Sequence, residues 1–318
     1  MSRVFNNPDQ VREQTRNDVL SAAQSLGYRP NASARTLRTQ RSHVLGVILP
    51  TLTNPVFAEC LQGIAHATAK NGLSMMPATT DYDIHVESEA INTLLSFGID
   101  GALLVVSDAK TSGAVTHLKS AGIPYVLVYN RHPEHPCISV DSEAALAEQV
   151  HELVNLGHKR IAMVCGLRSA SDRAALRHSA FERSMREAGL EPAPLIEVSF
   201  MQAASEAIAS ALAQPDRPTA LVCSNDLLAI RAMRAAQQVG LHVPDELSIT
   251  GFDGIAIGQD ITPALSTIVQ PNQHMGRFAV ELLVQAIRRQ APLSAADSIT
   301  LPYQIQRGES CTHPASSF

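Results

Sequence analysis

Short apolar runs alternate with longer amphipathic stretches over most of the chain. The runs are rich in β-branched residues or leucine, and the stretches between them are rich in alanine, with apolar residues at helical spacing. Continuous apolar strands separated by helices are typical of a mostly parallel sheet covered on both faces. The pattern therefore predicts an α/β fold, and its length favours two lobes, each with a doubly wound parallel sheet. The predicted strands are Val44 to Leu49, Gly101 to Val106, Tyr125 to Tyr129, Arg160 to Cys165, Ala220 to Cys223 and Leu247 to Phe252.

The first 42 residues have a different pattern. Residues 15 to 26 carry apolar side chains at helical spacing, and Gly27 follows as a stop signal, so we predict a helix there. A second short helix is predicted from Ala32 to Leu37, where Asn31 can cap its first turn. The polar, basic segment from Arg38 to Ser42 then forms a linker to the α/β body.

The charge is divided unevenly along the chain. The whole sequence has a net charge of −5, which by itself argues against a nucleic-acid partner. Residues 1–42 contain seven arginines and three acidic residues, a net charge of +4, whereas the remaining 18 basic and 27 acidic residues give −9. A basic arm on an acidic body is consistent with DNA binding through the arm alone.

No secretory leader and no apolar run of about 18 residues is visible, so we expect a cytoplasmic protein without a membrane partner. The five cysteines are scattered singly, which argues against a disulfide framework and against a zinc site. The pair His132 and His135 lacks further ligands at useful spacing, and we interpret it as part of a surface turn. We expect no metal and no cofactor.

Several short motifs occur in order along the chain. They include Ser2-Arg3-Val4-Phe5-Asn6, Thr15-Arg16, Leu26 to Asn31, Asn54 to Phe57, Gly98 to Gly101, Leu156 to Ile161, Ser224 to Asp226 and Gly251 to Asp253. Together these motifs resemble the lactose-repressor (LacI/GalR) family of bacterial transcription regulators. The resemblance covers essentially the whole chain and implies a partial all-α helix-turn-helix headpiece, a hinge helix and a two-lobed body similar to periplasmic sugar-binding proteins. It also implies a homodimer.

The headpiece motif begins inside the recognition helix of the family. Met1 occupies a position where the family usually has valine, and Ser2 and Arg3 match later residues of that helix. Either the start site is assigned too late, since a valine codon GTG can be taken for an initiator, or the headpiece is truncated. We favour the first interpretation.

The predicted domains are a partial headpiece over residues 1–30, a hinge helix and linker over 31–42, and an effector-binding and dimerisation body over 43–318. Within the body we expect an N-lobe of about 43–155 plus 271–296 and a C-lobe of about 156–270 plus 297–312.

The predicted DNA-binding residues lie in the recognition helix and the hinge helix. Arg3 can pair with guanine in the major groove, and Leu37 matches the family's leucine that opens a base step in the minor groove. From spacing alone, a flexible linker with one incidental leucine is the alternative for the hinge. The full set is Ser2, Arg3, Asn6, Asn31, Ala34, Arg35, Leu37 and Arg38.

The predicted effector-binding residues follow strands, where doubly wound folds bind ligands. Carboxylate and amide oxygens accept protons from hydroxyl groups, while arginine and amide nitrogens donate, so this combination suits a small sugar or sugar acid. Asn54 is also consistent with a simple turn, and Asp141 with a helix cap. Arg177 is the strongest candidate, because a buried arginine needs an anion or several acceptors. The set is Asn54, Phe57, Asp141, Arg177, Asn225 and Asp253.

These features predict a ligand-responsive, DNA-binding transcriptional regulator, a repressor, whose partners are operator DNA and the effector. Motifs near Asp253, Gly258 and Met275 are similar to those of gluconate-type regulators, which favours sugar acids. The common catalytic motifs are absent from the sequence, so we predict no enzymatic activity and no catalytic residues. The alternative is a sugar-binding protein without DNA-binding activity, because its headpiece is incomplete.

Overall fold

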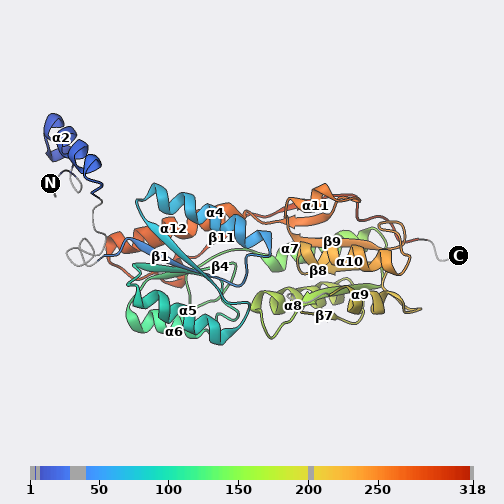
Figure 1. Cartoon of the computed structure of the whole chain (residues 1–318). Helices are drawn as coiled ribbons and strands as arrows, with labels where there is room; N and C mark the ends of the chain where they lie inside the picture. The colour runs from blue at the N-terminus through green and yellow to red at the C-terminus, as the bar shows by residue number, and fades with distance from the viewer. Residues whose placement is uncertain (1–3, 5–7, 29–40, 200–203, 316–318) are drawn as a thin grey trace. The chain divides into compact units, whose positions relative to one another are not determined.

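The chain forms two compact units, residues 1–43 and 44–318. A computed structural model describes residues 4, 8–28, 41–199 and 204–315 of the chain (Figure 1). No helix in these described ranges is long and apolar enough to span a membrane.

The first unit contains the helix that the sequence predicts. After the short 3-10 helix η1 (Pro8–Gln10), α2 spans Glu13–Ser25. Gly27 follows with φ of 60°, and the amide of Tyr28 donates to the carbonyl of Ala23 at 2.8 Å, which closes the helix end. All eight predicted DNA-binding residues lie outside the described ranges and stay predictions: Ser2, Arg3, Asn6, Asn31, Ala34, Arg35, Leu37 and Arg38.

The second unit, the body, contains two six-stranded sheets. The first sheet has the order β11-β5-β4-β3-β1-β2, and all its neighbouring strands are parallel. Its central strands are almost entirely buried, whereas the edge strand β2 is largely exposed or half-buried. The strands are β1 (Val44–Leu49), β2 (Ser74–Thr79), β3 (Gly101–Leu104), β4 (Tyr125–Val128), β5 (Cys137–Val140) and β11 (Ile299–Leu301).

The second sheet has the order β12-β10-β9-β8-β6-β7. Its strands are parallel except β12, which pairs with β10 in the antiparallel sense. The strands are β6 (Ile161–Gly166), β7 (Ile196–Val198), β8 (Ala220–Cys223), β9 (Ser248–Asp253), β10 (Ser266–Val269) and β12 (Gln304–Gln306). Two parallel, helix-covered sheets confirm the predicted α/β class.

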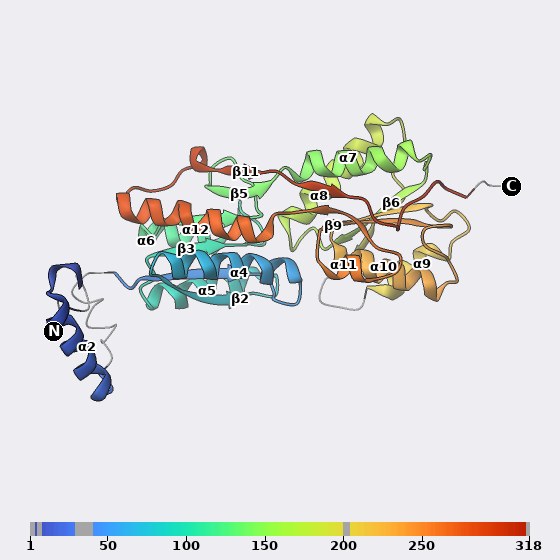
Figure 2. The same ribbon diagram turned by 90° about the horizontal axis from the view of Figure 1, so that it is seen from above.

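Helices cover both faces of each sheet (Figures 1 and 2). On the first sheet, α4 (Pro55–Lys70) and α12 (Asn272–Arg289) lie on one face, with α5 (Ile84–Ser96) and α6 (Gly113–Ala121) on the other. On the second sheet, α7 (Ser142–Asn155) and α8 (Asp172–Glu187) lie opposite α9 (Ser205–Leu212) and α10 (Asp226–Gln238). The short elements α11 (Ile257–Asp260) and η2 (Ala295–Asp297) complete the body.

Two elements lie in a different lobe from the one that the sequence predicts. We expected α7 in the N-lobe, but α7 packs against α8 over the second sheet. We expected residues 297–312 in the C-lobe, but β11 pairs with β5 in the first sheet. The chain therefore passes between the lobes after β5, after β10 and between β11 and β12. Strand pairing and helix packing determine which lobe each element joins, and neither can be predicted from the local periodicity of the sequence.

Two glycines allow α4 and α12 to pack with their backbones in contact. A Cβ atom at Gly63 would overlap the backbone carbonyl oxygen of Gln273, and one at Gly276 would overlap that of Cys60. Because backbone atoms cannot move aside cheaply, these two positions set the distance between the helices.

We expect Gly276→Ala to destabilise the protein by about 1–3 kcal/mol, because the added methyl group forces the two helices apart. The urea midpoint of unfolding, followed by circular dichroism, should decrease. Gly166→Ala is the control, because a Cβ there would have no neighbour within 4 Å. Equal midpoints for Gly276→Ala and the wild type would contradict the close packing.

Candidate functional site

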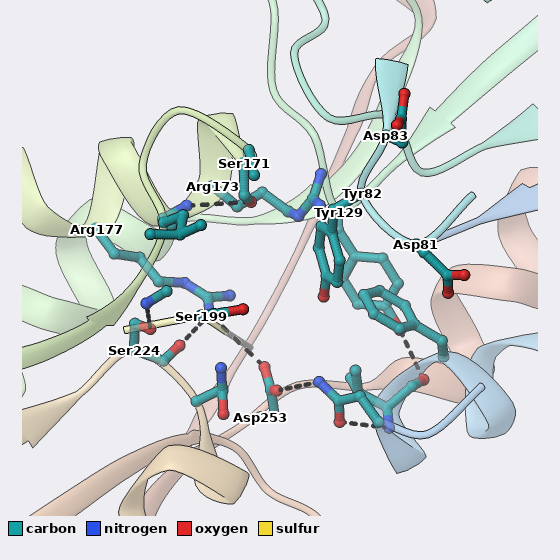
Figure 3. Close-up of a pocket in the computed structure, with 18 of the residues that line it drawn as sticks. Asp81, Tyr82, Asp83, Tyr129, Ser171, Arg173, Arg177, Ser199, Ser224 and Asp253 are labelled. Carbon is teal, nitrogen blue, oxygen red and sulfur yellow. Dashed lines mark hydrogen bonds and ion pairs between the residues drawn. The ribbon is translucent and has the colours of Figure 1, made fainter. Parts of the chain in front are cut away.

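A cavity of about 470 Å³ lies between the two lobes of the body (Figure 3). Its walls come from the loops that follow the carboxyl ends of parallel strands in both sheets. From the first lobe, Asn54, Phe57, Asp81, Tyr82, Asp83 and Tyr129 line it. From the second lobe come Ser171, Arg173, Arg177, Ser224, Asn225 and Asp253. The structure thus brings five of the six predicted effector-binding residues to one cavity.

Helix caps hold two of these predicted residues in place. The side chain of Asn54 accepts from the amide of Val56 at 3.3 Å at the start of α4. Asn225 accepts in the same way from the amide of Leu228 at 2.9 Å at the start of α10. Each side chain therefore caps a helix and lines the cavity at the same time, which fixes its orientation.

Arg177 reaches from α8 into the cavity and is only 7% exposed. Its Nη1 donates to the carbonyl of Ser224 at 2.5 Å and lies 3.8 Å from Oδ1 of Asp253. The guanidinium stacks on the ring of Phe252, 3.6 Å from the ring centre. Burial lowers the pKa of Arg177, and the charge of Asp253 opposes this shift. The Nε atom of Arg177 is buried without a partner among the described residues.

Asp253 ends β9 in a strained conformation, with φ of 126°. Its carboxylate accepts from Nε2 of Gln270 at 2.8 Å and, more weakly, from Nδ2 of Asn54 at 3.5 Å. Burial raises the pKa of Asp253 to about 7, although the charge of Arg177 acts in the opposite direction. Since Asn54 belongs to the first lobe, Asp253 also links the two lobes.

An aromatic wall faces this charged group. The rings of Phe57 and Tyr129 meet edge to face, with their centres 5.7 Å apart. Tyr82 lies in the β2–α5 loop, where Asp81 and Tyr82 both have positive φ, 49° and 63°. Asp81, Tyr82, Asp83 and Tyr129 also line the cavity and were not among the residues predicted from the sequence. The edge strand β2 precedes residues 81–83 and has no apolar run, so the hydrophobic pattern does not predict a strand there. Tyr129 follows β4, whose apolar run is visible in the sequence, so this residue could have been predicted as a cavity residue.

Asp141 lies elsewhere. Its side chain accepts from the amide of Ala144 at 3.1 Å and caps α7, and it forms a half-exposed ion pair with Arg131 at 3.5 Å. It does not line the cavity. The structure therefore supports the capping alternative for Asp141, and its predicted effector role stays a prediction.

A second set of contacts joins the lobes beside the cavity. Nδ2 of Asn130 donates to both carboxylate oxygens of Asp172, at 2.8 and 2.9 Å. The amide of Ala109 also donates to Asp172, and the amide of Asp172 donates back to the carbonyl of Ser107 at 2.7 Å. These bonds connect the start of α8 with the first lobe. A ligand that separates or tightens the lobes must change them.

Comparisons with known proteins agree with this geometry. The model for bacterial regulatory proteins of the lacI family matches residues 1–31, and the model for the periplasmic binding protein-like domain matches residues 150–311. The HTH-type transcriptional regulator GntR of Escherichia coli (strain K12) is 33% identical over 294 residues, 91% of this chain and 87% of that protein. The chain belongs to the LacI family. It is therefore a transcriptional regulator with an effector-binding body, as the sequence motifs predict.

Two further similarities extend over nearly the whole LacI-family chain. Catabolite control protein A of Priestia megaterium is 30% identical, covering 96% of this chain and 93% of that protein. The lac repressor dimer bound to operator and the anti-inducer ONPF has the same fold, with a TM-score of 0.87 at 24% identity over 98% of this chain and 94% of that one. The matching family model and the GntR relative describe transcriptional regulators and not enzymes.

We expect Asp253→Asn to remove a pH dependence of stability. The pKa is about 7 in the folded protein and about 3.9 in an unfolded chain. The folded wild type therefore holds the extra proton between these values, and its stability relative to the variant falls as the pH rises from about 4 to 7. Urea midpoints measured across this range test the trend.

The exposed Asp216→Asn substitution serves as the control and should show no such trend. A difference between the wild type and Asp253→Asn that is constant with pH would contradict the raised pKa.

Proposed function

We propose that the cavity between the lobes binds a small sugar or sugar acid and that this effector changes the affinity of the protein for operator DNA. The observation that carries the proposal is the incompletely partnered charge of Arg177, buried beside Asp253 in a cavity of about 470 Å³. A buried guanidinium with a free donor is costly unless a ligand supplies the missing acceptor.

The two sides of the cavity complement the two surfaces of a sugar. Asn225, Asp253 and Arg177 offer both donors and acceptors to hydroxyl groups. Phe57 and Tyr82 offer apolar ring surface to the carbon-bound hydrogens of the same molecule. A mostly preformed site with few convergent polar groups is typical of small-molecule binding.

Effector binding can change the relative arrangement of the lobes, because side chains from both lobes contact each other at the cavity. The bonds from Asn54 to Asp253 and from Asn130 to Asp172 are made in one arrangement of the lobes. An effector that binds one arrangement better shifts the population toward it, and operator binding shifts by the same factor through linkage. We propose that the protein is a cytoplasmic homodimer. In this dimer the hinge segment, residues 31–42, transmits the change in lobe arrangement to the bound operator.

We expect Arg177→Gln to lower effector affinity by about 10- to 100-fold, because it removes a charged hydrogen-bond donor from the cavity. The effector is first found by thermal-shift screening of five- and six-carbon aldoses and aldonates, and its affinity is then measured by calorimetry. Arg183→Gln is the matched control, because Arg183 is on the same helix but is exposed and paired with Glu143. Wild-type affinity in Arg177→Gln would refute the assignment.

We expect operator binding to weaken steeply with salt, because arginine side chains displace counterions from phosphates. The operator is selected from randomised palindromic duplexes and its affinity is measured by gel shift at several salt concentrations. Arg38→Gln should reduce the slope by about 1 for each phosphate that the arginine neutralises in the wild type. Arg160→Gln, an exposed change in the body, should leave the slope unchanged. Failure to select any duplex would favour the alternative of a ligand-binding protein without DNA-binding activity.

A further inference from the structure

Two arginines on one face of α8 point into the same cavity. Arg173 and Arg177 are four residues apart, so they lie one turn apart on the helix. Their side chains are only 10% and 9% exposed, and both line the cavity. Two like charges at this spacing repel each other, and the charge of Arg173 helps to lower the pKa of Arg177. Asp172 and Asp253 lie at ion-pair distance from Arg173 and Arg177, and a further anion beside both guanidinium groups would reduce the remaining repulsion.

Each guanidinium keeps a donor without a partner. Nη1 of Arg173 donates to the carbonyl of Val106 at 2.7 Å and lies 3.4 Å from Asp172, but Nη2 is buried and makes no hydrogen bond to any described residue. In Arg177 the buried nitrogen without a hydrogen-bond partner among the described residues is Nε. Figure 3 shows both side chains extending from α8 toward the space in front of Tyr82 and Tyr129. One wall of the cavity therefore carries two almost fully buried guanidinium groups, each with one nitrogen that lacks a hydrogen-bond partner among the described residues.

The carboxylates that lie beside the two arginines also accept hydrogen bonds from other groups. Asp172 accepts from Asn130 and from the amide of Ala109. Asp253 accepts from Gln270 and Asn54, and Asp83 caps α5 by accepting from the amides of His85 and Val86. Asp81 lines the cavity but is exposed. Because the pKa of Asp253 is raised to about 7, its negative charge is incomplete at neutral pH, which leaves excess positive charge on this wall.

The start of α8 adds to the positive potential. Ser171 caps the helix, and Arg173 lies in its first turn. The N-terminal end of a helix carries partial positive charge and favours anions. The helix end and the two arginines thus lie on the same side of the cavity, and Asp172 in the same first turn offsets part of their positive charge.

We propose that Arg173 and Arg177 together bind a carboxylate, so that the effector is a sugar acid and not a neutral sugar. This inference rests on the proposal that the cavity is the effector site. A carboxylate has two oxygens and can accept a charged hydrogen bond from each of the two guanidinium groups. Arg173 also holds the backbone of the first lobe through Val106, so it connects the bound carboxylate directly to the position of that lobe.

The test compares matched pairs of ligands. Calorimetry with five- and six-carbon aldonates, the corresponding aldoses and the aldose phosphates should give tighter binding for at least one aldonate than for its aldose and its phosphate. Arg173→Gln should then weaken the aldonate about 10- to 100-fold and the aldose by less than about threefold. Arg173→Lys, which keeps the charge but loses the planar fork, should lie between the wild type and Arg173→Gln.

Control measurements separate binding from folding. Arg183→Gln removes an exposed charge from the same helix and should leave all affinities unchanged. Thermal unfolding of each variant without ligand shows whether the loss of the bond to Val106 unfolds the body. If Arg173→Gln does unfold it, the contrast between aldonate and aldose in Arg173→Lys decides the question.

The possible failures are distinguishable. If neither aldonates nor aldoses bind, the cavity is not a sugar-type effector site and the proposed function fails with this inference. If an aldose binds as tightly as its aldonate, or if Arg173→Gln weakens both equally, only the carboxylate assignment fails. Tightest binding of an aldose phosphate would overturn the carboxylate in favour of a phosphate.

Discussion

The passage of the chain between the two sheets is the constraint on which the cavity depends. The chain crosses after β5, after β10 and between β11 and β12, so each sheet contains strands from separate parts of the sequence. The loops after β1, β2 and β4 line the cavity from one lobe, and those after β6, β8 and β9 line it from the other. A ligand site between the lobes follows from this connectivity.

The buried charges in the cavity are costly for folding, and neighbouring elements hold them in place. Phe252, Ser224 and Asp253 surround the guanidinium of Arg177 on three sides. None of them accepts a hydrogen bond from Nε of Arg177, and the backbone of Asp253 is strained. Strain and incomplete pairing of this kind are characteristic of sites built for a ligand, because the ligand supplies the missing interaction.

The first lobe supports its side of the cavity through the packing of α4 against α12. The hydroxyl group of Tyr129 lies 3.1 Å from the carbonyl oxygen of Val56 at the start of α4 and 3.2 Å from Oδ1 of Asn272 at the start of α12, so these two acceptors share its single proton. The close approach of these helices at Gly63 and Gly276 therefore belongs to the same rigid unit as the aromatic wall.

The sequence by itself determined the α/β class, the central strands and the family, and it predicted five of the residues that line the cavity. Central strands such as β1 and β8 are buried on both faces, so their apolar runs are continuous and visible, and candidates such as Asn225 and Asp253 lie where such runs end. Only the tertiary structure decided the lobe that α7 joins and the contact of Arg173 with Val106, which depend on residues far apart in the sequence. Periodicity describes which face of an element is apolar, but it does not specify which other element covers that face.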